Sequence, residues 1–231
     1  DSDFLSSFTI AIQLAAILAV VTLYFRRLTQ SFLIWKKIIL AFIPTAIIGF
    51  AFFSFLRGLL ANERVMILAI ILGGVAMILI EWWLARRGAH LTSSSRMTQP
   101  DVQHQRSDIS YTQSFFVGLF QAIAFIPGVS RSAATIMGGL LLGIQRKAVV
   151  EFSFLLAIPT MAAATGLDLL RTSAIFTTQQ WLMLALGFVV SFAVALAAIK
   201  WLLRFVEHYT FVPFGVYRIV MGLILGFVIL F

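Results

Sequence analysis

The sequence PGVSRSAAT (Pro127–Thr135) places an arginine, two serines and a threonine inside a run that is otherwise apolar from Phe115 to Ile144. An arginine at membrane depth costs roughly 2.5–3.5 kcal/mol on insertion scales, so it marks a functional site by default. Proline followed by glycine breaks a helix at this point. We therefore expect two half-helices whose junction carries a polar site, with hydroxyl groups on both sides of the guanidinium to bind an oxyanion such as phosphate.

The composition is that of a polytopic helical membrane protein. Of 231 residues, 61% are hydrophobic and 11% are charged, and the mean hydropathy is +1.02. Soluble domains are about 45–50% apolar and about 25% charged. The net charge of +8 is expected from basic helix ends facing the cytoplasm and does not indicate a nucleic-acid partner. Because the chain has no cysteine, disulfides and thiolate sites are excluded.

Six segments are apolar over the roughly 20 residues that a membrane span requires. They are Phe4–Phe25, Ile38–Leu56, Val65–Leu84, Val149–Leu170, Trp181–Leu203 and Phe211–Phe231. Together they predict one integral membrane domain over residues 1–231. A hydrophilic stretch, residues 85–112, separates a first membrane half (1–84) from a second (113–231) and is rich in Ser, Thr and Gln in its middle, which is typical of a surface loop.

The remaining apolar region, residues 115–144, either spans the membrane or enters and leaves by one face. If it re-enters, twelve basic residues lie on one side and three on the other, whereas a full span divides them nine to six. The positive-inside rule favours re-entry, with the hydrophilic loop in the cytoplasm and both chain ends outside. Irregular backbone at membrane depth is allowed where it lines a cavity, so the break marks one.

The motif contains several groups that can bind an anion. Gly128 allows close approach of a ligand, and Ser130 can cap a second half-helix that begins at Arg131. Free N–H groups and the positive dipole end of that helix favour anions, and the fork of Arg131 suits phosphate oxygens. Ser132 and Thr135 are three residues apart and share a helix face.

A structural explanation competes with this one for part of the motif. Ser, Thr and small residues are common at membrane helix interfaces, and Ala134, Gly138, Gly139 and Gly143 suit close packing. Close packing explains the small residues but not Arg131.

Two of the polar residues inside predicted spans are further candidates for the site. Gln13, in the first span, either makes an interhelical hydrogen bond or faces the cavity. Arg218, in the last span, is a candidate for a second phosphate contact.

At these residues the chain resembles a known family. PGVSRSAAT looks like the PGxSRSxxT signature of bacterial undecaprenyl-diphosphatase of the bacitracin-resistance type. The stretches IQLAAILAV (12–20), EFSFLLAIP (151–159) and FVPFGVYR (211–218) resemble other parts of the same family. The similarity covers nearly the whole chain.

The resemblance implies a function. The family hydrolyses undecaprenyl diphosphate to the monophosphate in the bacterial inner membrane, which recycles the lipid carrier of cell-wall synthesis. Its fold consists of two inverted repeats, each with a re-entrant hairpin, around a cavity that opens to the outer face. By this resemblance Ser130, Arg131, Ser132 and Thr135 hold the diphosphate. Arg131, Ser130 and Ser132 are the candidate catalytic residues, and the residues themselves offer Gly128, Gln13 and Arg218 as further candidate substrate contacts. A polyprenyl diphosphate lipid is the expected partner, and a homodimer is possible.

The chain departs from the family pattern near its start. The family carries an E-x-x-x-E pair and a P-V-S-S-T-x-H stretch, to which metal binding and catalysis are assigned, and this chain contains neither. It also has Thr9 where the family usually has glutamate. The resemblance implies a divalent cation, Mg or Ca, whose ligands are not in this chain. We therefore expect the chain to be a truncated, inactive form.

A second interpretation is a transporter or flippase for a phosphorylated lipid carrier. Inverted repeats and an anion site at a half-helix also suit alternating access. A third is a non-catalytic relative with a scaffolding role. Lipid reorientation in vesicles without hydrolysis would distinguish the transporter.

Overall fold

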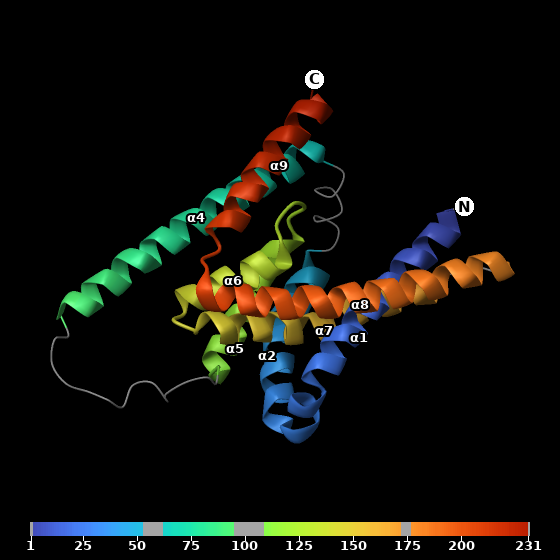
Figure 1. The fold of residues 1–231 in the computed structure, drawn as a ribbon, viewed down its shortest axis with the longest axis horizontal. Coiled ribbons are helices and arrows are strands. Elements are labelled where there is room, and N and C mark those ends of the chain that lie inside the picture. Colours follow the sequence, from blue (N-terminus) through green and yellow to red (C-terminus); the bar gives the residue numbers. More distant parts are fainter. Residues whose placement is uncertain (1, 53–61, 95–108, 172–176, 231) are drawn as a thin grey trace.

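The computed structural model describes residues 2–52, 62–94, 109–171 and 177–230, which form eight α-helices and one short 3₁₀ helix, with no strand among them (Figure 1). The helices are α1 (Ser2–Gln30), α2 (Phe32–Ala51), α4 (Glu63–Ser94), α5 (Tyr111–Ala122), η2 (Ile123–Phe125), α6 (Arg131–Leu141), α7 (Arg146–Arg171), α8 (Thr178–His208) and α9 (Val212–Leu230). The predicted all-α fold class is confirmed.

Five of these helices are long and apolar enough to cross a membrane. The segments are Ser7–Gln30, Phe32–Ala51, Glu63–Arg87, Thr178–His208 and Val212–Ile229. They correspond to five of the six predicted spans. Helix α7, which contains the predicted span Val149–Leu170, is 26 residues long but is not among the five described segments that meet this criterion. Its residues Phe152, Leu155 and Leu156 are almost fully buried inside the protein.

The predicted loop over residues 85–112 is shorter than expected, because helix continues at both of its ends. Helix α4 extends to Ser94 and α5 begins at Tyr111; residues 95–108 lie outside the described part of the chain. The guanidinium carbons of Arg86 and Arg87 lie 3.4 and 3.7 Å from the ring centres of Trp82 and Trp83. These i,i+4 stacking pairs stabilise the helix beyond its apolar section. A helix end predicted from polarity alone is therefore too early.

Two long helix pairs form the arms of the molecule. Helix α4 packs along α9 and α1 along α8, and the far ends of the two pairs diverge in Figure 1. The first pair approaches through glycines, since a Cβ on Gly74 would lie 2.6 Å from the Gly215 carbonyl oxygen. Close backbone approach through small residues is the usual way in which membrane helices associate.

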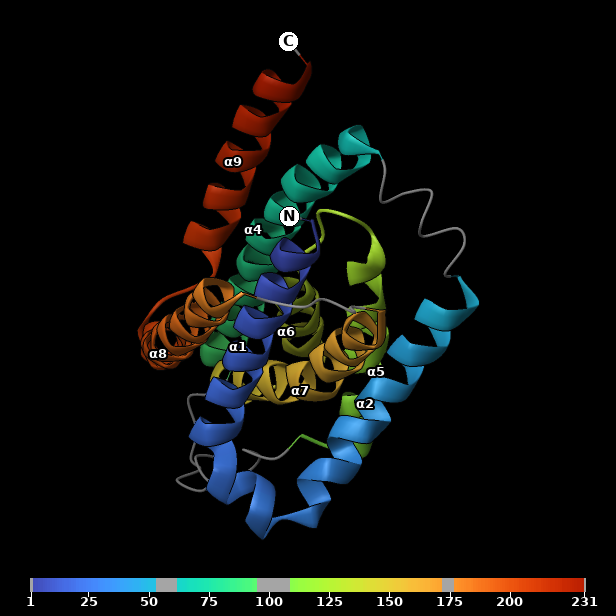
Figure 2. The same ribbon diagram turned by 90° about the vertical axis from the view of Figure 1, so that its right-hand side faces the viewer.

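Helices α5 and α6 form a hairpin that lies between α2 and α7. Gln113 Nε2 donates to the Leu142 carbonyl at 3.2 Å, which joins the start of the hairpin to its end. Gly118 of α5 lies against the Ala41 backbone of α2, where a Cβ would collide, and Thr45 Oγ1 donates to the Gly118 carbonyl at 2.7 Å. Figure 2 shows α6 and α7 at the centre of the molecule, with α2 on one flank and α9 on the other.

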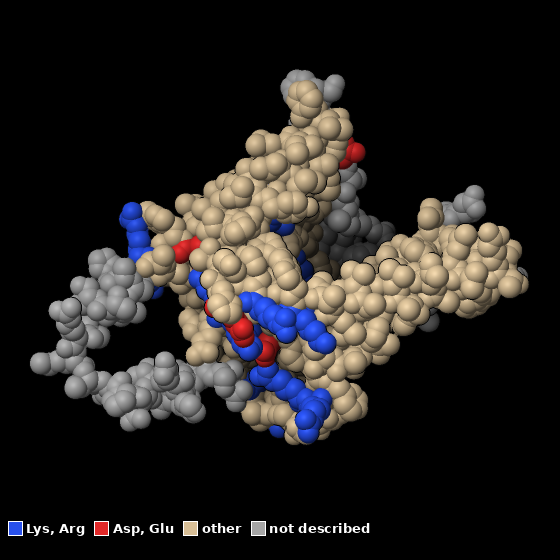
Figure 3. Space-filling view, viewed as in Figure 1, with Lys and Arg blue, Asp and Glu red and all other residues tan. Residues whose placement is uncertain are grey.

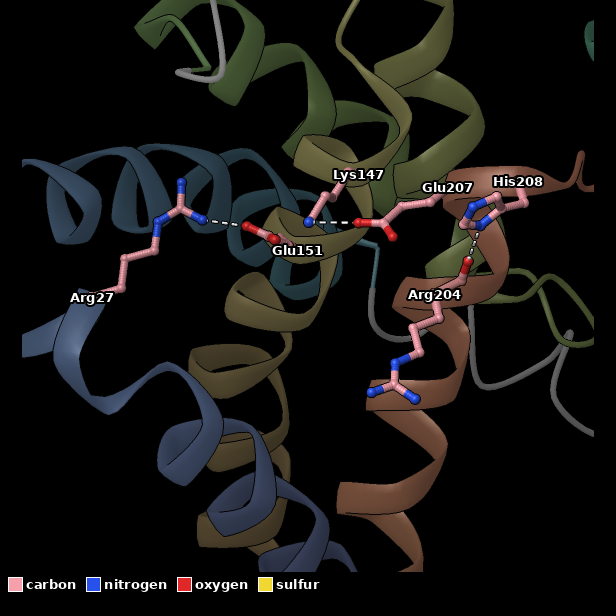
Figure 4. A network of polar contacts seen from close by, with 6 residues as sticks. All are labelled: Arg27, Lys147, Glu151, Arg204, Glu207 and His208. Atoms are coloured by element: carbon pink, nitrogen blue, oxygen red, sulfur yellow. Dashed lines mark hydrogen bonds and ion pairs between the residues drawn. The ribbon is translucent and has the colours of Figure 1, made fainter.

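The start of α7 is tied to three other helices by ion pairs. Two of them belong to a polar network that includes the end of α8 (Figure 4). The pairs are Arg146–Glu81, Lys147–Glu207 and Arg27–Glu151. Lysine and arginine gather around this end in Figure 3, whereas the two arms are almost free of charge on the face shown. Charged side chains at one end and apolar arms agree with an orientation set by the positive-inside rule.

Candidate functional site

Ser130 caps the N-terminus of α6, as the sequence predicts. Its backbone is extended, with φ −75° and ψ 125°, and its Oγ accepts from the Ala133 N–H at 3.3 Å. Its carbonyl accepts from the Ala134 N–H at 2.9 Å. The N–H groups of Arg131 and Ser132 remain at the open end of the helix, where an anion can accept from them.

Arg131 is the first residue of α6 and is half-buried. Its Nη1 donates to Thr160 Oγ1 on α7 at 2.8 Å. The hydroxyl of Thr160 in turn donates to the Leu156 carbonyl at 2.9 Å. The guanidinium is therefore held in place by a neutral side chain, and among the described residues it makes no ion pair.

The hydroxyl groups of the motif point to different places. Ser132 is exposed, and its Oγ lies 3.1 Å from Ser130 Oγ. Thr135 is fully buried, and its Oγ1 lies 2.6 Å from Ser153 Oγ on α7. The two serines stay at the open end of α6, while Thr135 fastens α6 to α7.

Gly128 and Arg218 meet at the turn of the hairpin. Gly128 has a φ of 90°, which favours glycine, and a Cβ here would collide with the Met66 carbonyl oxygen of α4. Arg218 of α9 donates from Nη2 to the Gly128 carbonyl at 2.7 Å. Its Nε is buried and has no partner among the described residues. Gly73 makes room for this side chain, because a Cβ there would lie 2.8 Å from Arg218 Nη2.

Gln13 lies at a different interface. Its Oε1 accepts from Thr165 Oγ1 at 3.1 Å, which joins α1 to α7. This is the interhelical hydrogen bond that the sequence offers as one of two interpretations. The structure thus brings together Gly128, Ser130, Arg131, Ser132 and Arg218, and places Thr135 and Gln13 in helix contacts.

The groups around the start of α6 do not fit a metal ion. They are guanidinium groups, hydroxyls and amides, and the described residues contain no group of three His, Cys, Asp or Glu side chains that could hold a metal. Divalent cations such as Mg²⁺ and Ca²⁺ need oxygen ligands, usually including carboxylates, and two arginines repel them. We assign no step to a metal at these residues.

An apolar cavity of about 490 Å³ lies beside this site. Residues of α4, α5 and α6 form its walls, and Ser130 and Arg218 are the polar side chains among the residues that line it. The candidate anion-binding groups therefore border an apolar cavity.

Two residues of this arrangement, Thr160 and Ser153, are not among the site residues that the sequence predicts. Both are hydroxyl residues of α7 that contact the motif, Thr160 through Arg131 and Ser153 through Thr135. Thr160 directly follows Pro159, the proline inside α7. A hydroxyl beside a helix proline is the signal that could have drawn attention to Thr160, since prolines in membrane helices disturb the local backbone bonding. Ser153 lies in the stretch EFSFLLAIP that resembles the family, but no local pattern distinguishes it within that stretch.

Comparison with known proteins decides the family. The model of the family described as bacitracin resistance protein BacA matches residues 1–224. The chain belongs to the BacA family. A relative named undecaprenyl-diphosphatase from Aquifex aeolicus is 45% identical over 231 residues, which is 100% of this chain and 85% of the relative. Relatives of the same name from Persephonella marina (45% identity, 97% of this chain, 83% of the relative) and Wolinella succinogenes (42%, 98% and 84%) agree.

Membership of the BacA family, together with five apolar helices, places the chain in the bacterial inner membrane as a multi-pass protein. The resemblance seen in the sequence is confirmed. The comparisons do not bear out the expectation of an inactive form.

Proposed function

We propose that this chain hydrolyses undecaprenyl diphosphate to undecaprenyl phosphate and inorganic phosphate, with the diphosphate held at the N-terminus of α6. The observation that carries the proposal is Arg131, a half-buried guanidinium at a capped helix start, fixed by Thr160 at 2.8 Å and not neutralised by a described carboxylate. The names of the relatives supply the substrate and the reaction.

Each group at the site has a role in this reaction. The fork of Arg131 and the N–H groups of Arg131 and Ser132 bind phosphate oxygens, and the hydroxyls of Ser130 and Ser132 donate to them. A water oxygen forms a bond to the terminal phosphorus as the bond from that phosphorus to the bridging oxygen breaks. The bridging oxygen leaves with the lipid monophosphate, and the protons of the water remain on the inorganic phosphate or pass to solvent. Positive charge and donors fixed in advance stabilise the charge that develops on these oxygens.

Arg218 is the second cation of the site. Its contact with the Gly128 carbonyl holds the turn of the hairpin, and its unpaired Nε leaves donor capacity for a second phosphate group. Thr135 and Gln13 act indirectly in this scheme. Thr135 fixes α6 against α7 through Ser153, and Gln13 fixes α1 against α7.

We infer that α7 is the sixth span and that α5–η2–α6 is a re-entrant hairpin. The turn of the hairpin touches Met66 on α4, and its end is followed by Arg146, which pairs with Glu81 on the same helix. Helices α5 and η2 together have fifteen residues, 12 and 3, which correspond to roughly 22 Å of helix. This length is less than the roughly 30 Å of a hydrocarbon core. The joined ends of the hairpin, at Gln113 and Leu142, support entry and exit by one face.

Phosphate release from purified protein tests the function. Undecaprenyl diphosphate in detergent micelles is expected to yield one phosphate per lipid and to stop at the monophosphate, measured by phosphate assay and mass spectrometry of the lipid. Protein that releases no phosphate but reorients labelled lipid diphosphate in vesicles would be a transporter, and the hydrolase proposal would fail.

A further inference from the structure

We propose that Thr160 is a positioning residue, which orients Arg131 so that one edge of its guanidinium is left for the substrate phosphate. This assignment rests on the proposed function and deepens it, because it names a side chain of α7 that acts on the reaction through Arg131. Arg131 Nη1 donates to Thr160 Oγ1 at 2.8 Å, and within the described ranges the Arg131 side chain makes no other hydrogen bond.

The direction of the Thr160 hydroxyl is fixed by its neighbours on α7. A threonine hydroxyl has one hydrogen to donate and two lone pairs that accept. Thr160 Oγ1 lies 2.9 Å from the Leu156 carbonyl oxygen and 3.1 Å from that of Ala157. Because carbonyl oxygens only accept, the hydrogen is donated to them and the lone pairs face the guanidinium. Thr160 is therefore an acceptor with a fixed orientation, which suits a guanidinium that can only donate.

The proline before Thr160 explains why its hydroxyl bonds to the backbone. Pro159 lies inside α7 and has no N–H, so the Leu155 carbonyl four residues earlier loses its donor in the helix. Serine and threonine side chains bond to backbone groups near such prolines in membrane helices. The Thr160 oxygen is thus held by the backbone of α7, and its position follows from the helix itself.

A second contact sets the register between α6 and α7. The hydroxyl oxygens of Thr135 on α6 and Ser153 on α7 lie 2.6 Å apart, and Thr135 is fully buried. Thr160 follows Ser153 by seven residues, or two turns, and so lies on the same face of α7. The contact at Thr135 therefore fixes the two helices so that Arg131, one turn earlier on α6, reaches Thr160.

The contact with Thr160 leaves one edge of the guanidinium unused. Arginine has five N–H donors in a rigid planar fork, and Thr160 accepts from Nη1 alone. The Nε and Nη2 groups lie along another edge, from which a phosphate can accept two parallel hydrogen bonds. Because Thr160 is neutral, it orients the fork without cancelling its charge. We therefore expect Thr160 to affect the transition state through the placement of Arg131.

Thr160→Val tests this role, because it removes the hydroxyl and keeps a branched side chain of similar shape. Misplacement of a group that stabilises transition-state charge lowers kcat, and we expect a roughly tenfold loss with undecaprenyl diphosphate, since small displacements of such groups cost up to about 10²-fold. The KM should stay near the wild-type value, because the lost interaction acts in the transition state. Phosphate release from purified protein in detergent measures both constants. Wild-type kcat in this variant would overturn the assignment.

Two variants separate the contact with Arg131 from other effects. Thr160→Ser keeps the hydroxyl and should retain the wild-type kcat; a loss equal to that of Thr160→Val would show that the methyl group matters and not the hydrogen bond. Thr22→Val is the matched control. Thr22 Oγ1 also donates to the carbonyl four residues earlier, that of Leu18, at 2.8 Å, but its side chain is exposed on α1 and accepts from no cation in the described part of the chain. Its loss should leave kcat unchanged.

The combination with Arg131→Ala shows whether Thr160 acts through the guanidinium. Without Arg131, Thr160→Val should cause no further loss of kcat, because residues that act as one unit are not additive. A further tenfold loss in the double variant would show that Thr160 acts independently and would refute the assignment. Wild-type protein without phosphate release would contradict the proposed function, whereas normal release together with a fully active Thr160→Val protein would contradict only the role of Thr160.

Discussion

The starts of α6 and α7 both carry arginine, but the two helix ends differ in what faces the charge. At α7, Arg146 makes two hydrogen bonds of 2.5 and 2.6 Å to the Glu81 carboxylate, and the neighbouring Lys147 pairs with Glu207. At α6, Arg131 meets the hydroxyl of Thr160 and no described carboxylate. At the start of α7 both cations have carboxylate partners within the protein. At the start of α6, Arg131 has no carboxylate partner among the described residues.

This difference predicts that Arg146 has a structural role and that Arg131 binds a ligand. A buried charge is costly unless it is paired, so Arg146 offsets the cost of burying the Glu81 carboxylate. A half-buried arginine held only by a neutral oxygen keeps most of its capacity to bind an anion. The comparison predicts that variants at α6 change catalysis and that variants at α7 change stability.

Arg131→Ala should have the largest effect and is the strongest test of this distinction. Loss of a preorganised group that stabilises transition-state charge lowers kcat by about 10²–10³ in comparable sites. We expect such a loss in phosphate release, with the melting temperature nearly unchanged. Arg131→Lys should recover activity only in part, because an ammonium lacks the bidentate fork. An Arg131→Ala protein of near wild-type activity would remove the distinction.

Arg146→Met should produce the opposite result. It leaves Glu81, which is 3% exposed, without its cation, and removing one partner of a buried pair costs about 3–5 kcal/mol. We expect about 3 kcal/mol, at the lower end, because Arg146 itself is 31% exposed. Unfolding in detergent measures the loss, and kcat per folded molecule should stay at the wild-type value. A fall in kcat without loss of stability would place Arg146 in the active site.

Gly128→Ala tests whether the turn of the hairpin matters for activity as well as for stability. Alanine at a φ of 90° is strained by about 1–3 kcal/mol, and its Cβ also collides with Met66, which displaces the carbonyl that Arg218 binds. Stability and phosphate release should both fall. Gly143→Ala is the control, since it has a φ of 75° and open space around its Cβ. Equal activity in the two variants would show that strain alone, and not the Arg218 contact, determines the effect.

Lys147→Met should have the smallest effect. Its pair with Glu207 is exposed, and such surface pairs contribute little to stability because water and salt screen them. We expect a melting temperature and an activity indistinguishable from wild type. Since Lys147 directly follows Arg146 on α7, the two variants differ mainly in burial, and a large effect of Lys147→Met would show that burial is not what separates them.

The sequence predicted the helical fold class and the capped helix start at the polar motif because both depend on local features. Long apolar runs require helices in a bilayer, and Ser130 caps the helix that begins at Arg131 whatever lies around it. Helix ends were predicted less well: α4 continues through Arg86 and Arg87, which stack on tryptophans. Polarity indicates where a chain leaves the membrane and does not fix where its helix ends.

The partners of the motif could not be predicted in this way. Ser132 and Thr135 are three residues apart, yet Ser132 is exposed and Thr135 is fully buried against Ser153. Thr160 lies 29 residues from Arg131 and Arg218 lies 90 residues from Gly128. These contacts depend on how α7 and α9 pack against the hairpin, and no local pattern carries that information.

The sequence by itself determined that this chain is a helical membrane protein with a cationic, hydroxyl-rich break in an apolar hairpin, because hydrophobicity and helix capping act over a few turns. Only the tertiary structure decided which charges are neutralised, which hydroxyls remain open and where a cavity adjoins them. The reason is that pairing, burial and empty volume arise between helices distant in the chain, and they are set by the packing of the whole molecule.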